Sequence, residues 1–459
     1  MSWRLYYEYE NFREPEITHR RVKHNLIESL IKNYAKNPLF TVRELGKSYE
    51  GRSIYLMKAG TGKIKVFLWA QMHGDEPTAN AALFDIFRLL TQPGEFSALR
   101  DTILNNLSLY FIPMLNPDGA ERYIRETALG IDMNRDAVQL VTPEAYILMN
   151  TFKELRPDFG FNLHDQSIRH AAGFTPRQAT ISFLAPPFDY IKTMSKNRMR
   201  AVQVISQLTD ILHQFIPGHI GKYSDDYEPR AFGDTFQGLG ASTILVESGG
   251  WPDDPEKQSI RKINFITLLS AFSSIATGSY NKYSSAEYDN LPFNKRMLYN
   301  IILRNVKLNG AVTDIGIDHE EVNYDNARTF YYRGVVKKTG KLNENIGITE
   351  YDLSGYEVKP GKVYDATAEN IEAIDKRKLW SEGYLTVKTG NKEILARKFM
   401  KTGFNFTGSS ALKQTPVNTD SEANFVLVRN GKVDYIILNG FFINLKSDSG
   451  DLPNTLILQ

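Results

Sequence analysis

Apolar and polar positions in the first 278 residues follow two alternating patterns. A continuous apolar run at 66–70 is typical of a strand buried on both faces of a sheet, and further strands are expected at 107–114, 158–163 and 243–246. Apolar residues at helical spacing predict helices over 17–36, 77–90, 143–155, 190–215 and 254–276, and shorter strands are expected at 40–45, 53–58 and 181–184. Strands that alternate with helices predict an α/β domain with a mixed, largely parallel central sheet and helices on both faces.

The pattern changes near residue 278. Residues 279–294 are rich in Ser, Asn and Tyr with little periodicity, which predicts a linker. Strand-like segments follow at 297–308, 329–337, 385–387, 394–399 and 425–438, the last with an Asn430-Gly431 hairpin signal. We therefore expect an α/β domain over 1–278, a linker over 279–294 and a β-rich region over 295–459. That region would form one or two small sandwich-like domains; if two, they would divide near 375–385.

Composition excludes several classes of function. The 459 residues include no cysteine, which rules out disulfides, thiolate nucleophiles, iron–sulfur clusters and cysteine zinc sites. A net charge of +2 provides no bulk field for nucleic acid or an anionic membrane, and we expect neither as a partner. No signal-peptide or membrane-spanning run is visible, so we expect a cytoplasmic protein, or a secreted or periplasmic one if a signal has been removed.

A group of possible metal ligands follows the buried strands. His73 and Glu76 come directly after the run at 66–70 and precede a predicted helix. The carboxyl ends of strands are where open α/β sheets place their sites, although a lone His-x-x-Glu pattern is often an ordinary turn. His164 ends the next candidate strand and would complete a His/Glu/His set, which suits a catalytic zinc ion with an open coordination position.

Further polar motifs lie at comparable places. An Asn-Pro-Asp-Gly turn over 116–119 follows the strand that ends near Met114, and Arg125 precedes a Gly-x-Asp-x-Asn-Arg stretch over 130–135. Glu247 comes directly after the run at 243–246. A carboxylate in that position is costly to bury unless it has a partner or a chemical task.

In this order, the motifs resemble those of the zinc carboxypeptidase family typified by carboxypeptidase A, in its bacterial form. The stretch Gly46-Lys47-Ser48-Tyr49-Glu50-Gly51-Arg52 is similar to that family's upstream motif. The resemblance covers roughly residues 1–278. It implies that His73, Glu76 and His164 bind one zinc ion and that Asp132 orients the first histidine.

The resemblance also implies roles for the other motif residues. Glu247 would be the general base that accepts a proton from zinc-bound water. Arg125 would stabilise the oxyanion, with Arg122 as a competing candidate. Asn134 and Arg135 would bind the free α-carboxylate of the substrate, because a planar guanidinium meets a carboxylate bidentately. The family's mobile tyrosine would be Tyr227 or, alternatively, Tyr223, while His170 and Arg230 could also enter the site.

The function implied is a zinc-dependent metallocarboxypeptidase that hydrolyses the C-terminal peptide bond of peptides with a free C-terminus. An alternative is a zinc amidase or deacylase of N-acyl amino acids, because those relatives share the His-Gly-x-Glu and Asn-Arg elements. A third hypothesis is a non-enzymatic binding module that uses the β-rich region. The motifs at 46–52 and 116–119 favour the carboxypeptidase.

Overall fold

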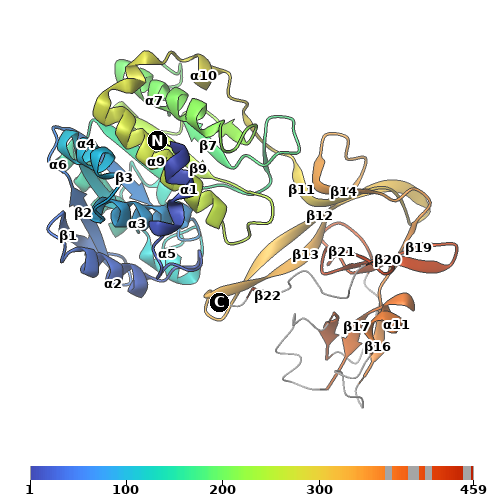
Figure 1. Ribbon diagram of the computed structural model, residues 1–459. Coiled ribbons are helices and arrows are strands. Elements are labelled where there is room, and N and C mark those ends of the chain that lie inside the picture. The colour runs from blue at the N-terminus through green and yellow to red at the C-terminus, as the bar shows by residue number, and fades with distance from the viewer. Residues whose placement is uncertain (1, 367–374, 391–402, 409–415, 448–455, 458–459) are drawn as a thin grey trace. The chain divides into compact units, whose positions relative to one another are not determined.

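The computed structural model describes residues 2–366, 375–390, 403–408, 416–447 and 456–457 (Figure 1). The chain forms two compact units, Met1–Arg296 and Met297–Gln459. The first unit holds every residue that the sequence singled out for chemistry. The second holds the β-rich region.

An eight-stranded sheet forms the centre of the first unit, in the order β1-β2-β4-β3-β5-β9-β7-β8. Its strands are β1 (Phe40–Lys47), β2 (Ser53–Ala59), β3 (Ile64–Ala70), β4 (Leu107–Ile112), β5 (Phe159–Asp165), β7 (Ile181–Leu184), β8 (Ile220–Lys222) and β9 (Ser242–Ser248). The four central strands, β4, β3, β5 and β9, run parallel, whereas β1, β2 and β7 have antiparallel neighbours. The predicted mixed, largely parallel sheet is therefore confirmed.

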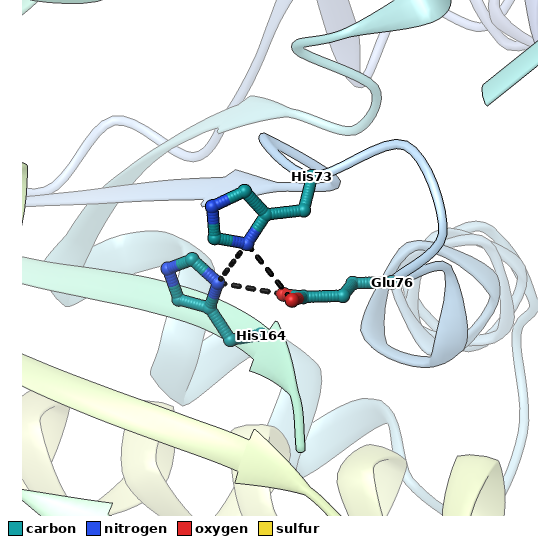
Figure 2. Close-up of side chains that lie close together, drawn as sticks. All are labelled: His73, Glu76 and His164. Carbon is teal, nitrogen blue, oxygen red and sulfur yellow. Dashed lines mark hydrogen bonds and ion pairs between the residues drawn. The ribbon is translucent and has the colours of Figure 1, made fainter. Parts of the chain in front are cut away.

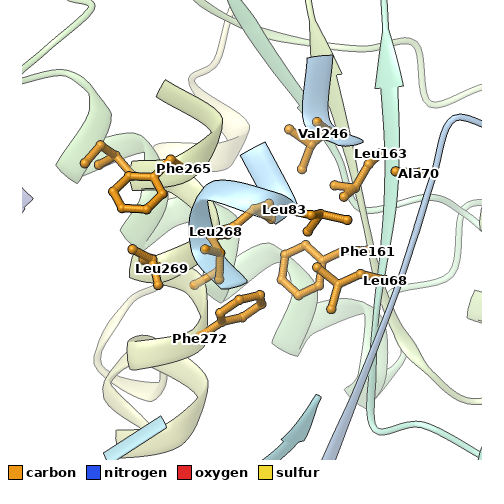
Figure 3. Packing of buried hydrophobic residues seen from close by; sticks show 14 of the residues in the cluster. Leu68, Ala70, Leu83, Phe161, Leu163, Val246, Phe265, Leu268, Leu269 and Phe272 are labelled. Atoms are coloured by element: carbon orange, nitrogen blue, oxygen red, sulfur yellow. The ribbon is translucent and has the colours of Figure 1, made fainter. Parts of the chain in front are cut away.

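Helices cover both faces of this sheet. One face packs against α3 (Thr78–Thr91), α7 (Lys196–Leu212) and α9 (Gln258–Thr277), and the other against α6 (Pro143–Leu155) and α8 (Phe232–Gly238). Figure 3 shows Leu68 and Phe161 of the strands against Leu83 of α3 and Phe272 of α9. Trp69 points to the opposite face, where it packs edge-on against Phe236. Burial on both faces explains why these strands are rich in apolar residues.

The remaining helices of the first unit are short: α1 (Ser2–Tyr7), α2 (His24–Tyr34), α4 (Ser97–Asn106), α5 (Pro117–Arg122) and α10 (Ala286–Asp289). Among the described residues, no helix combines the length and the apolar character needed to cross a membrane.

Three predicted helices begin several residues later than expected, among them α9, which was expected from residue 254 and starts at Gln258. The helix expected over 17–36 starts only at His24, because the preceding residues are held by tertiary contacts such as the bond from the Arg20 backbone N–H to Glu256. The helix expected over 190–215 starts at Lys196, where the Ser195 side chain accepts a hydrogen bond from the Arg198 backbone N–H. For these two helices, the helical spacing of apolar residues extends beyond the residues that form the helix.

The segment expected to be a linker is part of the first unit. Residues 279–294 contain the short 3₁₀ helix η3 (Ser279–Lys282) and α10, and Tyr280, Tyr288 and Leu291 are buried in the main core. The next strand, β10 (Asn294–Arg296), pairs with β6 (His170–Ala172). Large tyrosine rings supply the buried area here, which a periodicity of aliphatic residues does not reveal.

The second unit is built from strands, as expected. A nine-stranded sheet contains β11 (Leu298–Leu308), β12 (Ala311–Tyr324), β13 (Thr329–Gly340), β14 (Ile346–Asp352), β15 (Glu357–Pro360), β19 (Phe425–Arg429), β20 (Lys432–Leu438), β21 (Phe441–Asn444) and β22 (Leu456–Ile457). A three-stranded sheet contains β16 (Lys362–Asp365), β17 (Tyr384–Lys388) and β18 (Asn405–Thr407), next to α11 (Lys376–Ser381).

The hairpin expected at Asn430-Gly431 joins β19 to β20, and both turn residues have positive φ. The two faces of this hairpin bury separate clusters, one with Phe425 and Leu427 and one with Val426 and Ile436. Strand β12 was missed because Asp314, Asp318 and Glu320 interrupt its apolar pattern. The strand expected at 394–399 lies outside the described residues.

Candidate metal centre and substrate cleft

His73, Glu76 and His164 meet at the carboxyl ends of two adjacent strands. The chain leaves β3 at Ala70, turns through His73 and Glu76 and enters α3, while His164 is the penultimate residue of the neighbouring β5. The turn packs tightly, because a Cβ on Gly74 would lie 2.0 Å from the backbone carbon of Gly119. Glycine is thus required here, because any side chain at residue 74 would collide with the backbone of Gly119.

The three side chains point toward one another (Figure 2). Nδ1 of His73 lies 2.8 Å from Glu76 Oε1, Nδ1 of His164 lies 2.7 Å from Glu76 Oε2, and the two Nδ1 atoms are 3.1 Å apart. Neighbouring ligands of a tetrahedral zinc ion, at about 2.0–2.1 Å from the metal, are separated by roughly 3.3 Å. Two ring nitrogens and a carboxylate that converge in this way fit one divalent cation, and they are the only such group found among the described residues.

Charge around the ligands favours this assignment. Burial alone would raise the pKa of Glu76, but His73 and His164 hold it well below its usual range. Burial lowers the pKa of His164, which keeps its ring neutral as a metal ligand must be. Burial also acts to lower the pKa of His73, but the carboxylates of Glu76 and Asp132 outweigh it and raise that pKa to about 9. The pocket therefore attracts positive charge.

Asp132 and Arg125 form a second layer around His73. Nε2 of His73 donates a hydrogen bond to Asp132 Oδ1 at 3.0 Å, which leaves Nδ1 free to face Glu76. Arg125 donates from Nε and Nη2 to Asp132 Oδ2, at 3.2 and 3.0 Å, and from Nη1 to Glu76 at 3.0 Å. The competing candidate, Arg122, instead bonds to Glu50 on the surface.

Glu247 lies on the next strand, level with His164. The two residues are register partners of the parallel pair β5 and β9. Only 7% of Glu247 is exposed, and its Oε2 has no hydrogen-bond partner among the described residues. Burial, followed by the charge of Glu76, raises the pKa of Glu247 well above its usual range. A carboxyl group poised in this way can exchange a proton during a reaction.

These groups line a cleft of about 490 Å³ that also contains Asn134, Arg135, His170 and both candidate tyrosines. Arg135 extends toward Glu228, with 3.4 Å between Nε and the carboxylate. The Asn134 side-chain oxygen accepts a hydrogen bond from the Phe232 backbone N–H at the start of α8. Arg230 bonds to Glu228 from the rim and is not among the residues that line the cleft.

The two candidate tyrosines occupy different environments. The charge of Glu247, more than burial, raises the pKa of Tyr223 to about 12. Tyr227 packs edge-on against Tyr190, with ring centroids 5.0 Å apart. Sequence spacing alone could not separate the two. Tyr223 is the one that interacts with Glu247.

The two sequence motifs that precede the ligands form one structural unit. Asp118 is fully buried and accepts hydrogen bonds from the Ser48 hydroxyl at 2.7 Å and the Glu50 backbone N–H at 2.9 Å. Asn116 caps the next short helix by accepting from the Gly119 backbone N–H. These motifs therefore support the turn that carries His73 rather than contribute to the cleft.

Sequence reasoning missed one buried ion pair beside the metal ligands. Nζ of Lys257 donates to Asp165 Oδ2 at 2.9 Å and to the Ser248 carbonyl at 3.1 Å. The Asp165 backbone N–H in turn donates to Glu76 Oε2 at 3.1 Å. Lys257 precedes α9 and is 92 residues from Asp165 in sequence, so no local pattern could reveal the contact.

Comparisons with known proteins agree with this geometry. The family model described as zinc carboxypeptidase matches residues 27–166, which include His73, Glu76 and His164. Carboxypeptidase 2 of Trichophyton tonsurans is 25% identical over 137 residues, which is 28% of this chain and 25% of that protein. Carboxypeptidase B of Astacus astacus is 30% identical over 122 residues, 26% of this chain and 35% of that protein. The matches thus span about a quarter to a third of the length of these relatives.

Among solved structures, a metallo-carboxypeptidase from Burkholderia cenocepacia aligns with a TM-score of 0.47 and 16% identity, over 56% of this chain and 69% of that one. Carboxypeptidase A from Helicoverpa armigera aligns with a TM-score of 0.46 and 18% identity, over 56% of this chain and 74% of that one. The sequence match on the residues that build the metal centre carries the assignment. Residues 27–166 of the chain thus match the zinc carboxypeptidase family model, and these residues include the whole candidate metal centre.

Proposed function

We propose that this protein is a zinc-dependent metallocarboxypeptidase that removes the C-terminal residue of peptides. The observation that carries the proposal is the convergence of His73, Glu76 and His164 on one point, with Glu247 level with His164 on the adjacent strand. Arg135 in the same cleft supplies a cation for the free end of a peptide chain.

The reaction would be a hydrolysis in which a water oxygen bonds to the last peptide carbonyl carbon and the C–N bond breaks. Zinc, when bound, supplies a Lewis acid that polarises oxygen and makes water more acidic. Glu247 accepts a proton from the water and passes it to the departing amine, a role that suits its raised pKa. The Arg125 side chain, 41% exposed, donates hydrogen bonds to the oxygen that becomes negative.

Recognition of the chain end would fall to Asn134 and Arg135. A guanidinium group binds a carboxylate through two parallel hydrogen bonds, and an amide can add a further one. Requiring a free carboxylate makes the activity that of an exopeptidase. The amidase hypothesis shares the metal ligands, so substrate choice must separate the two.

The test uses purified protein, with zinc measured by atomic absorption. We expect one zinc ion per chain, loss of activity on chelation and its return with zinc. Hippuryl amino acids should be hydrolysed, whereas their C-terminal amides should not. Hydrolysis of simple N-acetyl or N-succinyl amino acids alone would overturn the proposal in favour of the deacylase. A zinc-loaded protein that hydrolyses neither class would overturn both.

A further inference from the structure

A second cavity lies in the first unit, separate from the substrate cleft. It holds about 260 Å³ and is bounded by the N-terminal segment, the end of α7 and the first turns of α9. Helix α1 packs on α9 here (Figure 1). No residue lines both this cavity and the cleft. We call it the N-terminal hollow; the residues that line it include Tyr6, Arg13, Phe215, Trp251, Gln258 and Lys262.

Aromatic rings form the walls of the N-terminal hollow. Tyr6 of α1 stacks on Phe215, which follows α7, with ring centroids 4.9 Å apart. Trp251, in the loop after β9, packs on His219 with 4.8 Å between the ring centroids. Rings of this size give the wall a large apolar area. A flat apolar ligand would bury that area well.

Lys262 places its ammonium group among these rings. Its Nζ lies 3.7 Å from the centroid of the Tyr6 ring and 5.6 Å from that of Tyr9. No Asp or Glu in the described part of the chain forms an ion pair with Lys262. Burial lowers the pKa of Lys262, as expected of an ammonium group that has lost part of its water shell. Ring faces attract a cation but leave its charge without a counter-ion.

The other charged groups at the hollow have partners. Nη1 of Arg13 lies 3.7 Å from a carboxylate oxygen of Glu10. Behind the wall, Arg261 donates to Asp85 through two hydrogen bonds of 2.8 and 2.5 Å, so that pair is neutral as a whole. The positive charge left to a ligand of the hollow is therefore that of Lys262.

The size of the hollow limits what can bind there. An apolar cavity of about 150 Å³ is large enough to hold benzene. The N-terminal hollow, at about 260 Å³, thus has room for two fused rings that carry a carboxylate. Such a ligand would place its rings against the aromatic wall and its negative charge on the ammonium group. A hydrogen bond between two charged groups is stronger than one between neutral groups.

We propose that the N-terminal hollow is a second binding site, which takes a small organic carboxylate with a flat apolar body, an aromatic acid, and pairs the carboxylate with Lys262. The inference does not rest on the proposed function, because the residues that carry it lie outside the cleft. Binding involves no covalent step.

The test measures binding and requires no turnover. Its probes are 2-naphthoate and the neutral 2-naphthamide, each titrated against the full-length protein by ligand-observed NMR. Ligand efficiencies ordinary for small molecules give 2-naphthoate a Kd of about 1 mM or tighter. We expect 2-naphthamide to bind at least about 10-fold more weakly, because the amide brings no negative charge to Lys262.

Variants of Lys262 separate its charge from its bulk. Lys262→Met should weaken 2-naphthoate binding at least about 10-fold and leave 2-naphthamide binding unchanged. Lys262→Arg should retain most of the affinity, because it retains a cation. Lys282→Met is the matched control, since Lys282 is exposed and lines neither the hollow nor the cleft. If Lys262→Met does not fold, the two probes on the parent still decide whether the site prefers an anion.

Arg135→Ala distinguishes the hollow from the cleft, where Arg135 is the cation proposed to hold carboxylates. Binding of 2-naphthoate that survives Arg135→Ala and falls with Lys262→Met supports the second site. Binding that is lost in Arg135→Ala and kept in Lys262→Met would place the anion in the cleft and overturn the inference. Equal affinity for the two probes, or no binding of 2-naphthoate at about 10 mM, would overturn it as well. The carboxypeptidase proposal is unaffected by each of these results.

Discussion

Replacing Lys257 by methionine would leave a buried carboxylate without its cation. Lys257 and Asp165 have side chains that are 9% and 6% exposed, and Nζ lies 2.9 Å from Asp165 Oδ2. The other group that donates to this oxygen is the Thr78 hydroxyl, at 2.5 Å. Methionine keeps the length of the side chain but supplies no donor. Asp165 would therefore keep its negative charge with only a hydroxyl to stabilise it, or take up a proton.

The expected cost follows from the burial of the pair. Breaking a buried ion pair by removing one partner costs about 3–5 kcal/mol, because the remaining charge stays out of water. In domains of about 150–250 residues, each kcal/mol lowers the melting temperature by roughly 2–4 °C. Lys257→Met should thus melt about 6–20 °C below the parent. Adding Asp165→Asn should restore most of the loss, because the double variant has no unpaired charge.

Differential scanning calorimetry can measure this effect. The candidate metal ligands lie in the first unit, so a transition that moves when zinc is added would report that unit. The matched control is Lys153→Met, at an exposed position of α6, which should change stability by less than about 0.5 kcal/mol. A Lys257→Met transition within about 2 °C of the parent, or a double variant that melts lower than the single one, would refute the reasoning.

Four further predictions concern the site itself. His73→Ala should abolish stoichiometric zinc binding, whereas Glu247→Gln should retain zinc and lose turnover; metal analysis with a kcat measurement separates the two roles. Arg135→Ala should raise KM for free peptides at least about 30-fold, because it removes the partner of a charged carboxylate, and Arg135→Lys should recover only part of the loss. Tyr223→Phe should shift the pH dependence of kcat/KM, because the charge of Glu247 raises the pKa of Tyr223 to about 12; an unchanged profile would show that the two groups are not coupled in the reaction. The pKa of Asp234 is raised from 3.8 to about 7, so the folded state holds the extra proton and stability should fall as pH rises from about 4 to about 7, by up to roughly 4 kcal/mol; Asp234→Asn should remove this decline in urea titrations.

The metal centre could be predicted from sequence because its parts are local. A histidine and a glutamate three residues apart, directly after an apolar run, place two ligands in one turn at a strand end. His164 and Glu247 follow their own apolar runs, and parallel strands bring such ends to one edge of the sheet. The central strands could also be predicted from the sequence, because burial on both faces leaves each of them rich in apolar residues.

The tertiary structure alone decided how distant residues share the site. Lys257 meets Asp165, Asp234 is buried next to Glu228, and Glu247 raises the pKa of Tyr223 only because the sheet and α8 bring them together. Such contacts depend on three-dimensional packing and leave no periodic signal in the chain. Residues 279–294 make the same point, since buried tyrosines hold a polar segment in the first unit. The sequence thus predicted which residues could hold a metal ion, and packing determined which buried charged groups lie next to one another.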